Sequence, residues 1–150
     1  MKGRFGRDAG APLPRFTTRD LGRTRVVIED ADGAGRWAAE RCLKGVGYAV
    51  VSCGGPDLLA RRRCPLEEDV DCPAIADADV VVSSLRLGDR RERAVIAGIR
   101  ARYPDTPLVI QATPMAAHRH RDLLAGCHVL TTFTGTALRH AVDEVLAPIG

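Results

Sequence analysis

The sequence predicts an α/β fold built on a five-stranded parallel sheet. Short runs of β-branched and other apolar residues alternate along the chain with helical segments of about 10–15 residues, which is the pattern of βαβ units. The runs are almost continuously apolar, as expected for parallel strands buried on both faces. A length of 150 residues fits one domain whose core needs neither disulfides nor metal for folding.

The first half of the domain contributes two strands and a helix. Residues 25–28 (RVVI) form a β-branched run typical of a buried strand. A helix is predicted over 34–46, with Gly47 as its C-cap. The only tryptophan, Trp37, lies on the apolar side of this helix, so we expect it in the core. Residues 48–52 (YAVVS) are predicted to form the second strand.

The second half adds three strands and three helices. In order, these are a strand at 79–83, a helix at 89–102, a strand at 107–110, a helix at 115–125, a strand at 128–131 and a helix at 135–147. Apolar residues recur in the last helix at helical spacing. This order suits a flavodoxin-like, doubly wound fold of three layers with strand order 2-1-3-4-5, in which ligands bind at the carboxyl ends of the strands.

The N-terminal segment differs from the rest of the chain. Residues 1–23 contain scattered glycine, proline and charged residues with no apolar period, so we expect a disordered basic tail before a domain at 24–148. A start codon assigned upstream of the true one is the alternative. Residues 1–25 carry a net charge of +5 and the remainder −2, which argues against a large nucleic-acid surface.

The sequence also indicates in which cellular compartment the protein lies. No apolar stretch approaches 18 residues, and the N-terminus has no hydrophobic signal region. Five cysteines, an odd number, fit reduced thiols better than a disulfide framework. We therefore expect a cytoplasmic protein that does not span a membrane.

Five segments in order resemble the receiver domain of response regulators, of which CheY is an example. They are VVIED at 26–30, GYAVVSC at 47–53, ADVVVSSLRLGD at 78–89, RARYPDTPLVI at 100–110 and HVLTTFTGTALRHAVDEVL at 128–146. The resemblance spans residues 25–147 and implies a signalling function in which a phosphoryl group is transferred to an aspartate. That chemistry needs a carboxylate nucleophile on the third strand, Mg²⁺ held by an acidic pair, a fourth-strand hydroxyl and a fifth-strand lysine.

Two of these groups are missing at the positions that the resemblance implies. Ser84 stands where the phosphoacceptor aspartate is expected, and Thr132 stands where the lysine is expected. No lysine follows Lys44 anywhere in the chain. The fourth-strand hydroxyl position falls on Ala112, with Thr113 one residue later. The chain therefore resembles a degenerate receiver, or pseudo-receiver.

The acidic pair is present as Glu29 and Asp30, with Asp32 as an alternate partner. Two interpretations stay open for it. The pair forms a weak Mg²⁺ site, or it belongs to a solvated loop that caps the following helix. Phosphorylation on a serine at 83 or 84 is a further alternative, although no base for a serine nucleophile is evident in the sequence.

We accordingly expect a non-catalytic module that acts through protein contacts. The surface implied by the resemblance is the last helix and the fifth strand, together with Phe133. The chain ends at Gly150, just after the last helix, so we expect the output to pass through a protein partner in trans or through a homodimer rather than through nucleic acid.

An insertion at 53–78 carries three cysteines, Cys53, Cys64 and Cys72. Prolines follow the last two and force them into extended or turn backbone, so only a short helix around 58–62 is expected. The alternative function is a metal- or redox-responsive module that uses these thiols. Zn²⁺, iron in a cluster or haem, redox sensing and simple burial all stay open, although the spacing C-x₁₀-C-x₇-C matches no standard zinc site.

Overall fold

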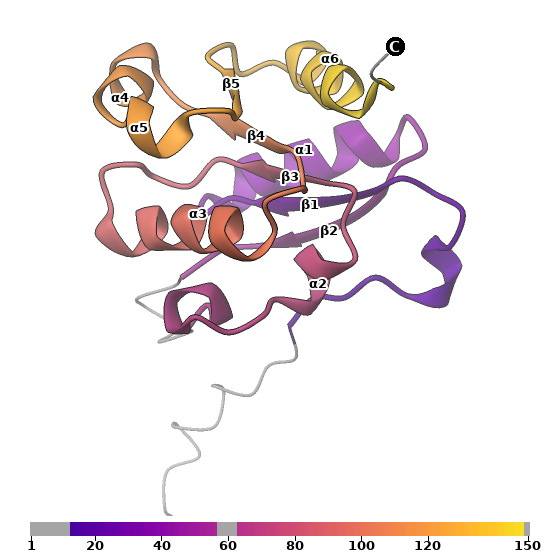
Figure 1. The fold of residues 1–150 in the computed structure, drawn as a ribbon. Helices are drawn as coiled ribbons and strands as arrows, with labels where there is room; N and C mark the ends of the chain where they lie inside the picture. Colours follow the sequence, from indigo (N-terminus) through magenta and orange to yellow (C-terminus); the bar gives the residue numbers. More distant parts are fainter. Residues whose placement is uncertain (1–12, 57–62, 149–150) are drawn as a thin grey trace, which may run out of the picture.

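The sheet has five parallel strands in the order β2-β1-β3-β4-β5 (Figure 1). The computed structural model describes residues 13–56 and 63–148. The strands are β1 (Arg25–Glu29), β2 (Ala49–Cys53), β3 (Val80–Ser83), β4 (Leu108–Gln111) and β5 (His128–Leu130). The predicted fold class and strand order are confirmed.

Helices cover both faces of this sheet (Figure 1). They are α1 (Gly33–Lys44), α2 (Pro73–Ala76), α3 (Arg90–Arg102), α4 (Pro114–Arg119), α5 (Arg121–Leu124) and α6 (Gly135–Leu146), with short 3₁₀ turns η3 (Thr18–Asp20) and η4 (Pro65–Glu68). The α1 and α6 helices pack on one face, and η4, α2, α3, α4 and α5 pack on the other. The result is the predicted three-layer arrangement.

Strand alternation divides the core into two clusters. Successive side chains of a strand point to opposite faces of the sheet. Val26 and Ile28 of β1 therefore pack beneath α1 and α6, whereas Val27 between them packs beneath α3. All three are at most 1% exposed, so the central strand is buried from both sides as its β-branched sequence predicts.

Side chains placed directly after the strands start the longer helices. Asp32 caps α1, Asp89 caps α3, Thr113 caps α4 and Thr134 caps α6, each by accepting backbone N–H bonds from the first turn. Such caps satisfy donors that the helix itself leaves unpaired. They hold the loops at the carboxyl edge of the sheet in fixed conformations.

Two helix predictions need correction. The helix predicted at 115–125 is two helices, because His120 leaves the helical conformation with φ −109° and ψ 26°. Trp37 is 59% exposed, not a core residue, and its ring lies 4.9 Å from the Arg41 guanidinium carbon. The side of α1 that faces the sheet carries Ala39 and Leu43 instead, and Trp37 is turned away from Ala39 by about 200°.

The N-terminal segment also differs from its prediction. Residues 13–23, expected to belong to a disordered tail, include the η3 turn, and Phe16 packs against the core cluster beneath α3. Residues 1–12 and the short helix expected around 58–62 lie outside the described residues. Among the described helices, none has the length and apolar character needed to cross a membrane.

The position of Trp37 can be tested by stability measurements. Trp37→Ala is expected to change the free energy of unfolding by less than about 1 kcal/mol, because the side chain gives up little more than an exposed contact with Arg41. The core variant Ile99→Ala should lose about 2–5 kcal/mol. Urea unfolding followed by far-ultraviolet circular dichroism compares the two. A loss as large for Trp37→Ala as for Ile99→Ala would contradict the exposed position.

Candidate functional site

A cleft of about 410 Å³ opens at the carboxyl ends of the strands, between α1 and the start of α6. Asp30 and Asp32 line it from the β1–α1 loop, Ser84 from the end of β3 and Gln111 from the end of β4. Phe133 lines it from the β5–α6 loop. This is the edge where doubly wound sheets bind ligands, and it brings together Asp30 and Ser84 as the sequence predicts.

Ser84 holds a fixed place at the centre of this edge. Its backbone N–H donates to the carbonyl oxygen of Glu29 at 2.7 Å, which extends the pairing of β1 with β3. Its hydroxyl donates to the side-chain oxygen of Gln111, a residue that was not predicted as part of the site. The position that the resemblance assigns to a nucleophilic carboxylate therefore carries a half-buried hydroxyl bonded to an amide.

The two aspartates of the cleft are occupied with local backbone contacts. Asp30 Oδ1 accepts the backbone N–H of Asp32 at 2.8 Å, and Asp32 Oδ2 accepts that of Gly35 at 3.0 Å. Arg36 Nη1 donates to the carbonyl oxygen of Asp30 at 2.9 Å. Burial raises the pKa of the Asp30 carboxyl, and the bond from Asp32 opposes this rise. The loop interpretation expected the Glu29–Asp30 pair to cap the helix, but the cap of α1 is Asp32.

Glu29 lies apart from these groups. As the last residue of β1 it shares the face of Val27, and it lines a second, small cavity of about 30 Å³ with Cys53, Cys64 and Cys72. Its side chain is 1% exposed, and Oε2 has no hydrogen-bond partner among the described residues. Burial raises the pKa of this carboxyl to about 7.

The acidic pair implied by the resemblance therefore does not fit a joint Mg²⁺ site. Asp30 faces the large cleft, whereas Glu29 faces the small cavity on the other side of the sheet. Two ligands of one ion must point toward one centre.

The positions implied for the phosphoryl-binding groups can also be located. Thr132 is exposed in the loop after β5 and does not line the cleft. Ala112 is buried, and the Thr113 hydroxyl accepts the backbone N–H of Ala116 at 3.2 Å as the cap of α4. Neither Ala112 nor Thr113 lines the cleft.

The three thiols of the insertion come together as neighbours in one cavity. Cys64 and Cys72 have extended backbone, with ψ of 131° and 113°, as their following prolines predict. Burial raises the pKa of the Cys64 thiol to about 12 and also raises those of Cys53 and Cys72. Thiols act as nucleophiles and metal ligands only when deprotonated, so these three are poor at both in this environment.

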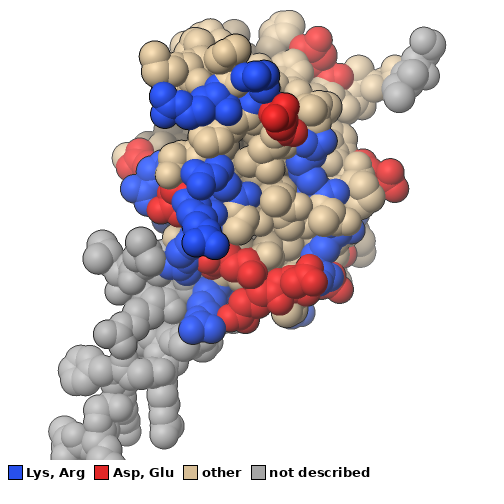
Figure 2. All heavy atoms as spheres, turned by 60° about the vertical axis from the view of Figure 1, so that its left-hand side comes forward, with Lys and Arg blue, Asp and Glu red and all other residues tan. Residues whose placement is uncertain are grey.

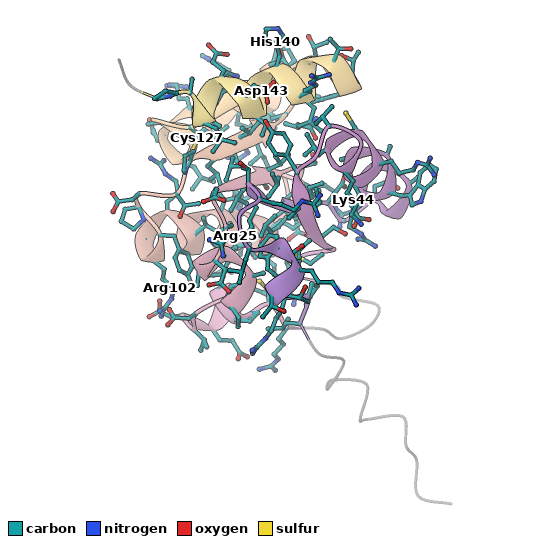
Figure 3. All side chains as sticks on the ribbon, turned by 90° about the vertical axis from the view of Figure 1, so that its right-hand side faces the viewer. Arg25, Lys44, Arg102, Cys127, His140 and Asp143 are labelled. Carbon is teal, nitrogen blue, oxygen red and sulfur yellow. The ribbon has the colours of Figure 1, made fainter. Side chains whose placement is uncertain are left out.

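The three thiols share their cavity with Glu29, but sharing a cavity does not make a metal site. Within residues 13–56 and 63–148, no three His, Cys, Asp or Glu side chains are placed to hold one metal ion. Cys127 precedes β5 at the amino-terminal edge of the sheet, the edge where Arg25 begins β1 (Figure 3). Cys53 ends β2 at the opposite edge. The Zn²⁺ or iron site at Cys53, Cys64 and Cys72 stays a prediction that this geometry does not support.

The buried carboxyl of Glu29 makes stability depend on pH. Up to about pH 4.5 the carboxyl is protonated in both the folded and unfolded chains. Above this pH the unfolded chain loses the proton first, so stability falls as pH rises, until the folded carboxyl also ionises at about 7. The loss should reach about 3 kcal/mol above that pH.

Urea unfolding at pH 5 and at pH 8.5 tests this pH dependence of stability, because the two values lie on either side of the pKa of the folded Glu29 carboxyl. Glu29→Gln should remove most of it and be the more stable protein at the higher pH, whereas the exposed-site control Asp105→Asn should behave like the unchanged chain. Equal pH dependence in the Glu29→Gln variant and the unchanged protein would contradict a carboxyl buried without a partner.

The fold can be compared with that of known proteins. A scan against protein-family models gave no match, and a search of curated protein sequences gave none either. Solved structures that share the backbone arrangement include response regulators. The chemotaxis response regulator CheY4 of Vibrio cholerae is 16% identical with a TM-score of 0.58, and the match covers 83% of this chain and 99% of that one.

The other two comparisons agree. A CheY-like response regulator receiver domain protein from Methanospirillum hungatei JF-1 is 16% identical, with a TM-score of 0.59 and coverage of 83% and 94%. The non-phosphorylated HemR receiver domain from Leptospira biflexa is 18% identical, with a TM-score of 0.61 and coverage of 85% and 98%. Such low identities show the fold and not the activity, so the chain has the flavodoxin-like fold that CheY-like receiver domains share.

Proposed function

We propose that the chain is a receiver-like signalling module that acts through contacts with a protein partner and is not phosphorylated by the aspartyl route. The observation that carries this proposal is Ser84. It directly follows β3, at the position where the resemblance to receivers implies a carboxylate, and its hydroxyl is bonded to Gln111. Without that carboxylate no acyl phosphate can form at this position.

A serine does not replace the missing nucleophile. A hydroxyl needs a neighbouring base to become nucleophilic, and the side-chain amide of Gln111 is not basic. The charges of the cleft also oppose a phosphoryl donor. Its described lining holds the carboxylates of Asp30 and Asp32 and no lysine or arginine, so an incoming phosphate meets repulsion rather than a positively charged group.

The surface around β5 supports a role in binding. The β5 strand lies at the edge of the sheet, where its outer backbone groups are open to pairing. Val129 on this strand is 37% exposed, and Phe133 in the following loop is 59% exposed. Large apolar side chains on a surface are typical of partner sites when they lie together. A partner in trans or a second copy of the chain is the proposed occupant.

The absence of aspartyl phosphorylation can be measured directly. After incubation with acetyl phosphate and Mg²⁺, intact-mass spectrometry should find no added phosphoryl group, because the carboxylate at the end of β3 is missing. A receiver known to accept phosphate from acetyl phosphate, treated in parallel, shows that the reagents work. A phosphoryl adduct that survives Ser84→Ala and is released by hydroxylamine, as an acyl phosphate is, would contradict the proposal. An adduct lost after Ser84→Ala would instead show that the serine is a nucleophile, against the inference that it lacks an activating base.

The proposed contact surface is tested by Phe133→Asp. In affinity capture from the source organism, a protein retained by the unchanged chain should be lost or at least about tenfold depleted with this variant, since a charge replaces a desolvated aromatic side chain. Met115→Asp, another exposed apolar side chain, is the matched control. Sedimentation velocity of the purified proteins reports whether a second copy is the partner. Equal retention and equal sedimentation of Phe133→Asp and the unchanged chain would contradict this surface.

A further inference from the structure

A second surface feature lies between α3 and the α4–α5 pair, away from the cleft. It is a groove of about 460 Å³ with Arg90 and Arg93 on the α3 side and Arg119 and His120 on the other. Figure 2 shows positively charged side chains gathered on the face that α3, α4 and α5 form, above a band of acidic side chains. We call this feature the arginine groove.

The acidic side chains below the groove are already paired. Glu67 binds Arg91 at 2.6 Å, Glu68 binds Arg63 at 2.9 Å and Asp71 binds Arg102 at 2.7 Å. These ion pairs join η4 and the loop after it to α3 and to the chain before η4. These acids neutralise Arg63, Arg91 and Arg102, so they are not paired with the arginines that line the groove.

The arginines of the groove itself lack such partners. Among the described residues, the side chains of Arg90 and Arg119 make no hydrogen bond or ion pair, and both residues are exposed. Arg93 donates to the carbonyl oxygen of Leu87 at 2.8 Å, but no carboxylate pairs with it in the described part of the chain. Asp122 is the one acidic side chain in the described lining. The groove therefore carries a net positive charge that the molecule does not compensate.

The floor of the arginine groove is small and apolar. It consists of Ala94 and Ala97 on α3 and Leu123 on α5. Both alanines are exposed, although the solvent side of a surface helix is normally polar. Short side chains let another backbone come close, while the flanking arginines reach past them. A groove with an apolar floor and positively charged walls is shaped for a peptide segment.

We propose that the arginine groove binds an acidic segment of a partner protein. A carboxylate accepts two parallel N–H bonds from one guanidinium, a geometry that lysine cannot offer. Leucine-like side chains of the same segment would pack on Ala94, Ala97 and Leu123. The groove favours a protein over nucleic acid, because its floor is apolar and the described lining holds no aromatic side chain to stack on a base.

This inference deepens the proposed function by naming the chemistry of a partner, yet it does not depend on the Ser84 argument. The groove is lined from α3, α4 and α5, whereas Phe133 lies beyond β5 at the mouth of the cleft. If the chain proved to be phosphorylated, it could still bind an acidic segment in the groove. If the groove bound no acidic segment, the chain could still bind a partner through β5 and Phe133.

Fluorescence polarisation of the full chain provides the test. The probe is a fluorescein-labelled peptide rich in glutamate and leucine, compared with the same peptide in glutamine form and with a labelled single-stranded RNA of equal length. Arg90→Glu with Arg119→Glu should weaken binding of the acidic peptide about tenfold or more. The control Arg15→Glu with Arg19→Glu makes the same charge change at exposed positions outside the groove and should leave binding within about twofold.

The fold of each variant is checked by circular dichroism, and the neutral pair Arg90→Gln with Arg119→Gln replaces the reversed pair if that one unfolds. The proposal is supported if only the groove variant loses affinity for the acidic peptide, and if the unchanged chain binds the glutamine peptide and the RNA more weakly than it binds the acidic peptide. It is overturned if the acidic peptide shows no saturable binding, or if the groove and control variants lose binding equally. It is also overturned if the control alone loses binding, or if the glutamine peptide or RNA binds the groove as well as the acidic peptide.

Discussion

The alternation of side chains at the end of β1 determines how the functional edge of this fold is arranged. Two adjacent carboxylates stand there, and adjacent residues of a strand face opposite sides of the sheet. Glu29 is consequently enclosed beneath η4 and α2 with the thiols, while Asp30 opens into the cleft beneath α1 and α6. In this structure the two carboxylates line different cavities. The two sides of the sheet therefore hold separate environments, one closed and apolar and the other open and acidic.

The closed side gives the cysteine insertion a packing role. Cys64 belongs to the core cluster beneath α3, and Cys72 packs against it. Cys64 is buried and Cys53 and Cys72 are partly buried around the cavity that Glu29 lines, and burial raises the pKa of each of the three thiols. Cysteine in such a place behaves as a small apolar residue. The Tyr103 hydroxyl binds the backbone of Cys72 through both its N–H and its carbonyl, and the Arg91–Glu67 pair holds η4 against α3. The insertion thus completes the layer over β1 and β3 that a longer helix would otherwise provide.

The sequence predicted the sheet well because buried parallel strands leave a strong local signal. Runs such as 79–83 are apolar without a break, and the helices between them end at glycine or charged residues. The prediction for Trp37 was wrong because α1 is rich in alanine, and alanine spacing does not show which side of the helix faces the sheet. Leu43 packs against the sheet instead. The candidate site was predicted only in part. Ser84 and Asp30 follow from their strand ends, but the Ser84–Gln111 bond requires the register of β3 with β4, which depends on contacts across the sheet.

The distribution of arginine explains why the net charge of the chain did not predict a binding surface. The chain has 22 basic residues, of which all but two are arginine, and a formal charge of only +3. Arg63, Arg91 and Arg102 are bound to acids that follow one another in the segment 67–71. Once those acids are satisfied locally, Arg90 and Arg119 lie across a groove whose described lining offers a single carboxylate. The sum over the chain is small because basic and acidic residues offset each other along the sequence, and it does not show that three arginines of the groove face one carboxylate in the described lining. Because guanidinium groups bind carboxylates through a planar fork, the binding that we propose for the groove depends on the geometry of a partner's acids as well as on their sign.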